Sequence, residues 1–208
     1  MKISKHVHSC LRIEENGKTV IVDPGNYTFE ANALDLGKIV TLNYLLITHE
    51  HPDHLYIPLV LEIDKRFPNC EIISNKSVAE ILKKEGIEVN TKGNKDIKIK
   101  EVPHERIFSG DVPQNTLFEI FGKLTHPGDS LHFDLNTDVL ALPVQAPWCS
   151  TTEAVETGKN LKPRIIIPVH DWHWNETARN NFYGRFKDYF KNENIEFIGL
   201  TTGELIEI

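Results

Sequence analysis

The chain has 208 residues, of which 40% are hydrophobic, so it can bury a core large enough to fold without disulfides. Its 30 acidic residues outnumber 23 basic ones, and the formal net charge of −7 disfavours a dedicated nucleic-acid binder. We therefore expect one domain over residues 1–208 and no nucleic-acid partner.

The N-terminal segment 1–15 is interrupted by polar and charged residues before the apolar core of a signal peptide can develop. No later apolar run is long enough to cross a bilayer. Cys10, Cys70 and Cys149 form no Cys-x-x-Cys pair, which argues against a disulfide framework and against a thiolate zinc site. These features predict a cytoplasmic protein without a membrane partner.

The first half of the chain alternates predicted strands and helices. Residues 9–25 are typical of two strands joined at Asn16-Gly17, because this pair accepts the positive φ angles of a tight hairpin turn. The run at 43–48 is continuously apolar, as in a strand that is buried on both faces. The next expected elements are a helix at 57–67, a strand at 71–74, and a helix that begins with a capping box of Ser77 and Glu80 and stops at Gly86.

The second half repeats this alternation, which indicates an α/β fold. Strands are expected at residues 116–121, 138–143 and 164–169. Ser150 and Glu153 form a predicted capping box for a helix that runs to about residue 161, and Asn175 can cap the last helix. In that last helix one face carries three aromatic residues, for which we expect core packing: Phe182, Phe186 and Phe190.

The segment YLLITHEHPDHLY places four candidate metal ligands directly after a predicted strand. His49 and His51 are two residues apart, so in extended backbone they point to the same side and can chelate one ion. Asp53 and His54 face another direction and would suit a second ion. The alternative is a solvated histidine-rich turn, but such a concentration of ligands is costly without an ion to offset it.

This segment matches the Thr-His-x-His-x-Asp-His hallmark of the metallo-β-lactamase superfamily at Thr48, His49, His51, Asp53 and His54. The resemblance extends along nearly the whole chain, through segments 6–25, 124–130 and 162–170. The chain is most similar to the compact branch that includes ascorbate-6-phosphate lactonase and related metal-dependent hydrolases. This resemblance implies an αββα sandwich with two internal halves and a metal site along one edge of the sheets.

The resemblance also implies two divalent ions, with zinc expected and manganese or iron as alternatives. His49, His51 and His104 would hold the first ion, Asp53, His54 and His170 the second, and Asp129 would bridge them. His170 lies at the end of a predicted buried strand, where α/β proteins build their sites. The segment around His104 lacks the Thr-Pro-Gly-His-Thr pattern of the glyoxalase-like and lactamase branches, which favours the lactonase-like branch.

Asp53 and Asp129 are expected to take part in catalysis as well as in metal binding. His126 lies three residues before Asp129, so we expect it near the site, in the outer sphere or as a proton donor. A loop histidine that contacts only solvent is the alternative. The resemblance gives His8 a structural or outer-sphere role.

Trp148 and Cys149 belong to a loop that reaches the mouth of the cleft in this branch. We expect a hydrophobic lid contact from Trp148, with stacking on substrate as the alternative. Cys149 has no adjacent base in the sequence and is not expected to be a nucleophile. His6, His132 and His173 have no motif support and are expected at the surface or in packing.

These observations predict a hydrolase that uses a metal-bound hydroxide to cleave a small ester, lactone or phosphodiester. The expected partner is a small-molecule substrate, which can be anionic because bound cations dominate the local field. A homo-oligomer is compatible with the sequence.

Three other functions stay open. A diiron redox protein uses the same fold, but it has a glutamate in place of the second motif histidine, whereas Glu50 is one place away from His51. The second alternative is a metal-binding protein without catalytic activity. A nuclease is the last, although the chain is short and acidic and has no evident RNA-binding segment.

Overall fold

The computed structural model describes residues 1–108 and 111–208, which form two six-stranded sheets. The first sheet has the order β12-β1-β2-β3-β4-β5, and its strands in chain order are β1 (Lys2–Lys5), β2 (Leu11–Glu15), β3 (Lys18–Val22), β4 (Tyr44–Leu46), β5 (Glu71–Ile73) and β12 (Leu205–Glu207). The second sheet has the order β11-β10-β9-β8-β7-β6, with β6 (Ile97–Val102), β7 (Asn115–Ile120), β8 (Leu124–His126), β9 (Val139–Pro143), β10 (Ile165–Val169) and β11 (Glu196–Phe197).

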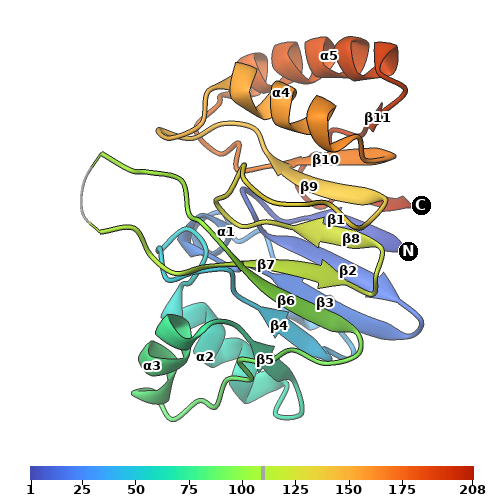
Figure 1. The fold of residues 1–208 in the computed structure, drawn as a ribbon. Coiled ribbons are helices and arrows are strands. Elements are labelled where there is room, and N and C mark those ends of the chain that lie inside the picture. Colours follow the sequence, from blue (N-terminus) through green and yellow to red (C-terminus); the bar gives the residue numbers. More distant parts are fainter. Residues whose placement is uncertain (109–110) are drawn as a thin grey trace.

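The two sheets pack face to face, with helices on the outer side of each (Figure 1). The helices are α1 (Asn26–Glu30), α2 (Ile57–Arg66), α3 (Lys76–Lys83), α4 (Thr151–Leu161) and α5 (Glu176–Asn192), and a short 3-10 turn, η1, covers Leu36–Lys38. The predicted α/β fold class is therefore confirmed.

Three hydrophobic clusters separate the four layers. Ile13 and Phe118 belong to the cluster between the two sheets. Ile63 of α2 belongs to the cluster on the outer face of the first sheet. Phe186 and Phe190 of α5 pack on the outer face of the second sheet, as the sequence predicted for this aromatic face. This layering is the expected αββα sandwich.

The predicted hairpin joins β2 to β3. Glu15 pairs with Lys18 across the antiparallel ladder, which leaves Asn16 and Gly17 as a two-residue turn. Their φ angles are +50° and +73°. Positive φ at both positions is what a type I′ turn requires, so this prediction is confirmed.

The caps of α4 and α5 also agree with the sequence. Ser150 and Glu153 exchange hydrogen bonds: the Ser150 hydroxyl accepts from the Glu153 amide at 3.2 Å, and the Glu153 carboxylate accepts from the Ser150 amide at 2.9 Å. Asn175 accepts a hydrogen bond from the amide of Ala178 at 2.8 Å. Both helices therefore begin where these side chains satisfy free amide groups.

The predicted cap of α3 was wrong by two residues. Asn75, not Ser77, lies before the first turn, and its side chain accepts from the amide of Val78 at 3.0 Å. The Ser77 hydroxyl is already inside the helix and donates to the carboxylate of Glu50 instead. Asparagine is as good a cap as serine, and here it occupies the extended backbone position that a cap requires.

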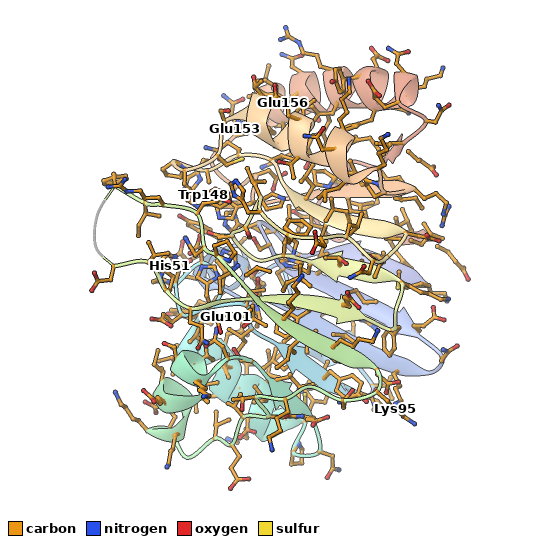
Figure 2. All side chains as sticks on the ribbon, in the orientation of Figure 1. His51, Lys95, Glu101, Trp148, Glu153 and Glu156 are labelled. Atoms are coloured by element: carbon orange, nitrogen blue, oxygen red, sulfur yellow. The ribbon has the colours of Figure 1, made fainter. Side chains whose placement is uncertain are left out.

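The loops that follow β4, β6, β8 and β10 gather at one edge of the sandwich, which we call the site edge. Strands β6, β8, β9 and β10 run in one direction, because β6 and β8 are both antiparallel to β7 while β8, β9 and β10 are mutually parallel. Figure 2 places His51 and Trp148 at this edge and Lys95 at the opposite side. Within the described ranges, no helix has both the length and the apolar character to span a bilayer.

Candidate metal centre

The motif segment 48–54 follows β4 and packs tightly on the turn at residues 23–25. A Cβ atom at Gly25 would lie 1.9 Å from the carbonyl oxygen of Asp53, so only glycine fits at this contact. The amide of Asn26 donates to the carbonyl of Pro52 at 2.8 Å. The glycine contact and this hydrogen bond together fix the backbone from which the motif side chains project.

Eight side chains form two groups at the site edge. The first group is His49, His51, His104 and Asp129, and the second group is His8, Asp53, His54 and His170. Within each group the ligand atoms lie within 4.8 Å of one another. The fold thus brings together all seven residues that the resemblance implied as ligands, and it adds His8.

Asp129 faces both groups. Its Oδ1 lies 3.1 Å from Nε2 of His54, and its Oδ2 lies 3.5 Å from Nε2 of His104 and 3.4 Å from Nε2 of His170. The side chain is only 2% exposed. This central position is the one expected of a bridging carboxylate.

The ring orientation of three histidines is fixed through Nδ1. His54 donates from Nδ1 to Asp23 at 2.7 Å, His104 to the carbonyl of Glu105 at 2.6 Å, and His170 to the carbonyl of Gln145 at 2.7 Å. Each ring therefore directs its Nε2 atom into the interior of the site. Outer-sphere bonds of this kind are typical of histidines that ligate metal ions.

The buried Nε2 atoms of His54, His104 and His170 lie 3.1–3.5 Å from the Asp129 carboxylate, yet neither they nor Oδ1 of Asp129 make a hydrogen bond of acceptable geometry. An unpaired buried polar atom costs about 1–3 kcal/mol, so four around one point would be destabilising if nothing bound there. Nitrogen and carboxylate oxygen are the donors that zinc, manganese and iron accept. The residues of both groups therefore fit divalent metal ions.

The charges of the site are complementary. Burial alone would raise the pKa of Asp129, but the neighbouring His170 and His54 hold it well below its usual range. Burial would lower the pKa of His170, but Asp129 outweighs this effect and raises it to about 9. Burial lowers the pKa of His8 to about 3. At neutral pH the carboxylate is therefore anionic and attracts a cation.

His126 is fully buried, so the solvent-exposed alternative was wrong. Its Nε2 donates to the carbonyl of Ser9 at 3.1 Å, and its Nδ1 accepts from the amide of Gly128 at 3.3 Å. Because both ring nitrogens bond to backbone, neither is free to give a proton to a substrate. These contacts favour support of the turn that carries Asp129 over the expected proton donor.

Asp23 is a residue of the site that sequence reasoning missed. Its carboxylate is fully buried and accepts from the Thr48 amide at 2.8 Å, from the Thr48 hydroxyl at 2.8 Å and from Nδ1 of His54 at 2.7 Å. Asp23 lies near the end of the predicted hairpin, and no motif in the sequence marks it as part of the site. The available signal was a carboxylate at the end of a strand that would pair with the motif strand.

His8 lies closer to the site than the sequence indicated. Its Nε2 donates to Oδ2 of Asp53 at 3.1 Å, and its ring centroid is 3.9 Å from that of His170. The side chain is 1% exposed. His8 therefore orients Asp53.

The loop with Trp148 and Cys149 does reach the site edge. The Trp148 ring lies 5.3 Å from the His170 ring and 6.2 Å from the His104 ring, and it packs against Cys149. Burial raises the pKa of Cys149 to about 12, which agrees with the prediction that it is not a nucleophile.

Three other histidines lie outside the two groups. His6 is buried and bonds to Ser4 and to the carbonyl of Ala33 at 2.8 Å, which is a packing role. His132 bonds to Glu105 at the surface. His173 is exposed, and its Nε2 atom lies 3.3 Å from the hydroxyl oxygen of Tyr27.

The comparisons with known proteins agree with this geometry. The model of the family described as "Beta-lactamase superfamily domain" matches residues 2–170 of this chain. A UPF0173 metal-dependent hydrolase of Geobacillus thermodenitrificans is 32% identical over 199 residues, covering 82% of this chain and 85% of that protein.

Two solved structures share the fold. One is Igni18, a novel metallo hydrolase from the hyperthermophilic archaeon Ignicoccus hospitalis, with a TM-score of 0.73 and 20% sequence identity. The match covers 100% of this chain and 98% of the Igni18 chain. The other is CmlA, a diiron β-hydroxylase from Streptomyces venezuelae, with a TM-score of 0.68 and 14% sequence identity. The match covers 100% of this chain and 54% of the CmlA chain. The chain therefore belongs to the metallo-β-lactamase superfamily, as a metal-dependent hydrolase of the UPF0173 group.

Proposed function

We propose that this chain is a binuclear hydrolase that cleaves a small ester, lactone or phosphodiester in a small-molecule substrate. One observation carries the proposal: the buried, unpaired Nε2 atoms of His54, His104 and His170 converge on Asp129. Two cations satisfy all of these atoms together.

The first group would hold one ion, the second group would hold the other, and Asp129 would contact both. Zinc is the ion we expect, with manganese or iron as alternatives, since no thiolate takes part. When bound, the ions supply a water molecule of lowered pKa and polarise the oxygen of the scissile bond. His8 and Asp23 would hold Asp53 and His54 in place.

Asp53 is the member of the two groups best placed to move a proton. Its side chain is 23% exposed, whereas that of Asp129 is 2% exposed. Burial would raise the pKa of Asp53, but His54 and the hydrogen bonds of His170 and His8 hold it well below its usual range. Asp53 is therefore ionised and reachable by substrate; a carboxylate of such low pKa is a weak base, so any proton it takes up would pass on to the leaving group.

The diiron alternative is disfavoured by the position of Glu50. Its carboxylate accepts a hydrogen bond from the hydroxyl of Ser77 in α3, so it points toward that helix and not into either group. His51 occupies the position where the redox group has its glutamate. CmlA resembles this chain in fold, and the ligand set proposed for this chain favours a hydrolase.

Elemental analysis and a substrate panel test the proposal. The protein should bind two ions per chain after loading with zinc or manganese and gentle dialysis. It should hydrolyse at least one of p-nitrophenyl acetate, a γ-lactone and bis(p-nitrophenyl) phosphate, lose this activity with a chelator, and regain it with metal. The variant His51→Ala should lose activity, and His132→Ala should retain it, because His132 lies outside both groups and is 75% exposed.

Two results would contradict the proposal. One is a single ion, or none, under conditions that saturate known binuclear sites. The other is a silent panel combined with oxygen consumption by the iron-loaded protein and a reductant, which would replace the hydrolase by the redox function.

A further inference from the structure

A buried ion pair joins the two sheets directly behind His170. Nζ of Lys5, at the end of β1, lies 2.7 Å from Oδ1 of Asp171, and it also donates to the carbonyl of Pro168 at 3.0 Å. Only 4% of the Lys5 side chain and 2% of the Asp171 side chain are exposed. Lys5 therefore binds the chain on both sides of His170, through Pro168 before it and Asp171 after it.

Helix α5 holds the same carboxylate from the other side. The hydroxyl of Tyr183 donates to Oδ2 of Asp171, and Nε of Arg179 lies 3.0 Å from that oxygen. Nζ of Lys5 also donates to the Tyr183 hydroxyl at 3.2 Å. Asp171 is thus fixed by side chains from β1 and from α5.

The backbone of His170 needs this support. Its φ angle is +61°, in the left-handed region that non-glycine residues rarely adopt. Such a conformation costs on the order of 1–3 kcal/mol and persists only where the surrounding structure holds it. The amide of His170 donates to the carbonyl of His8 at 3.2 Å, which adds one more constraint.

We propose that Lys5, Asp171 and Tyr183 are positioning residues that hold His170 in the second metal group. The proposal rests on the binuclear function proposed above. Replacing a whole buried ion pair by apolar residues is often neutral, whereas removing one partner leaves a buried charge uncompensated and destabilises the fold. A positioning role is therefore distinguished from a purely structural one by a loss of affinity confined to the metal group that contains His170.

The structure offers a control network of the same composition, which is partly exposed instead of buried. Lys18, Asp96 and Tyr44 form a second network of the same three residue types, in which Lys18 contacts Asp96, the Tyr44 hydroxyl donates to Asp96 at 2.7 Å, and Lys18 donates to that hydroxyl at 3.2 Å. Asp96 follows Lys95, which lies on the side of the molecule away from the site edge (Figure 2). This network touches neither metal group.

The test compares Lys5→Met, Tyr183→Phe and the control Lys18→Met in the metal-loaded full chain. Zinc is removed stepwise with a chromophoric chelator, which reports the affinity of each ion without any assay of activity. We expect Lys5→Met and Tyr183→Phe to weaken one of the two ions by about 10- to 100-fold, the range typical of lost outer-sphere contacts, while the other ion keeps its affinity. Lys18→Met should release both ions as the wild type does.

The outcomes separate this inference from the proposed function. A wild-type chain that binds fewer than two ions would overturn the binuclear function itself. Wild-type affinity for both ions in folded Lys5→Met and Tyr183→Phe would overturn the inference alone, and so would an equal loss at both ions, because that would indicate general loosening. If Lys5→Met does not fold, Tyr183→Phe decides, since it removes only one hydroxyl.

Discussion

Asp23 and His54 meet in a fully buried hydrogen bond, in which Nδ1 of His54 donates to Oδ2 of Asp23 over 2.7 Å. The two residues follow the neighbouring parallel strands β3 and β4. The second oxygen of Asp23 accepts from the amide of Thr48 at 2.8 Å. One carboxylate therefore fixes both the start of the motif segment and the ring of a candidate ligand.

The variant Asp23→Asn tests this relationship. An asparagine side chain has one acceptor oxygen where three donors now converge, so at least one of them would face an NH₂ group. We expect the affinity for the second ion to fall about 10- to 100-fold and the unfolding free energy to fall by about 1–3 kcal/mol. Chelator competition and urea unfolding measure the two effects.

Asp35→Asn is the control for this variant. Asp35 also accepts an amide hydrogen bond, from Gly37 at 2.9 Å, but it is exposed and belongs to neither metal group. Its substitution should leave both ion affinities unchanged. If Asp23→Asn also retained wild-type affinity, the orienting role of Asp23 would be wrong.

The parts of the fold that sequence could predict are those governed by local chemistry. The Asn16-Gly17 turn requires positive φ at both positions, and the Ser150–Glu153 box needs only residues three apart. By contrast, β1 and β12 pair the two ends of the chain, with the terminal amine donating to the carbonyl of Ile208 at 2.7 Å. Such a contact leaves no pattern in either segment alone.

The same distinction applies to the site. The four ligands of the motif are neighbours in sequence, whereas the roles of Asp23, His8 and His126 depend on which strands become adjacent. His126 shows the limit clearly: its place near Asp129 followed from spacing, but the direction of its ring depends on the carbonyl of Ser9, which is 117 residues away. Only the folded arrangement determines which ring nitrogens stay free.

Two glycines should respond in opposite ways to alanine. Gly25→Ala places a Cβ atom 1.9 Å from the backbone oxygen of Asp53, so we expect a loss of about 3 kcal/mol in unfolding free energy together with weaker metal binding. Gly184 lies inside α5 with open space around it, and Gly184→Ala should stabilise the chain by about 0.5–1 kcal/mol. Urea unfolding of both variants checks the signs, and a stable Gly25→Ala with intact metal sites would contradict the contact.

Thiol reactivity should be low in the native chain. Burial raises the pKa of Cys149 and that of Cys70 to about 12, so at pH 8 roughly one thiol in ten thousand is ionised. We expect slow alkylation by iodoacetamide in buffer, a rate that rises with pH as the thiolate forms, and fast alkylation in urea. Mass spectrometry assigns each modified cysteine. Rapid labelling of native Cys149 would reopen its role as a nucleophile.

The final prediction separates a candidate ligand from a supporting residue. His104 presents an unpaired Nε2 3.5 Å from Asp129, whereas both ring nitrogens of His126 are bonded to backbone. His104→Ala should therefore weaken the first ion by far more than the roughly 100-fold upper range of an outer-sphere loss. His126→Ala should keep two ions but lower the unfolding free energy by about 1–3 kcal/mol and slow turnover, because the turn that carries Asp129 loses its support. Chelator titration and urea unfolding of the two variants give the answer. If His126→Ala released an ion while His104→Ala retained both, the two roles would have to be exchanged.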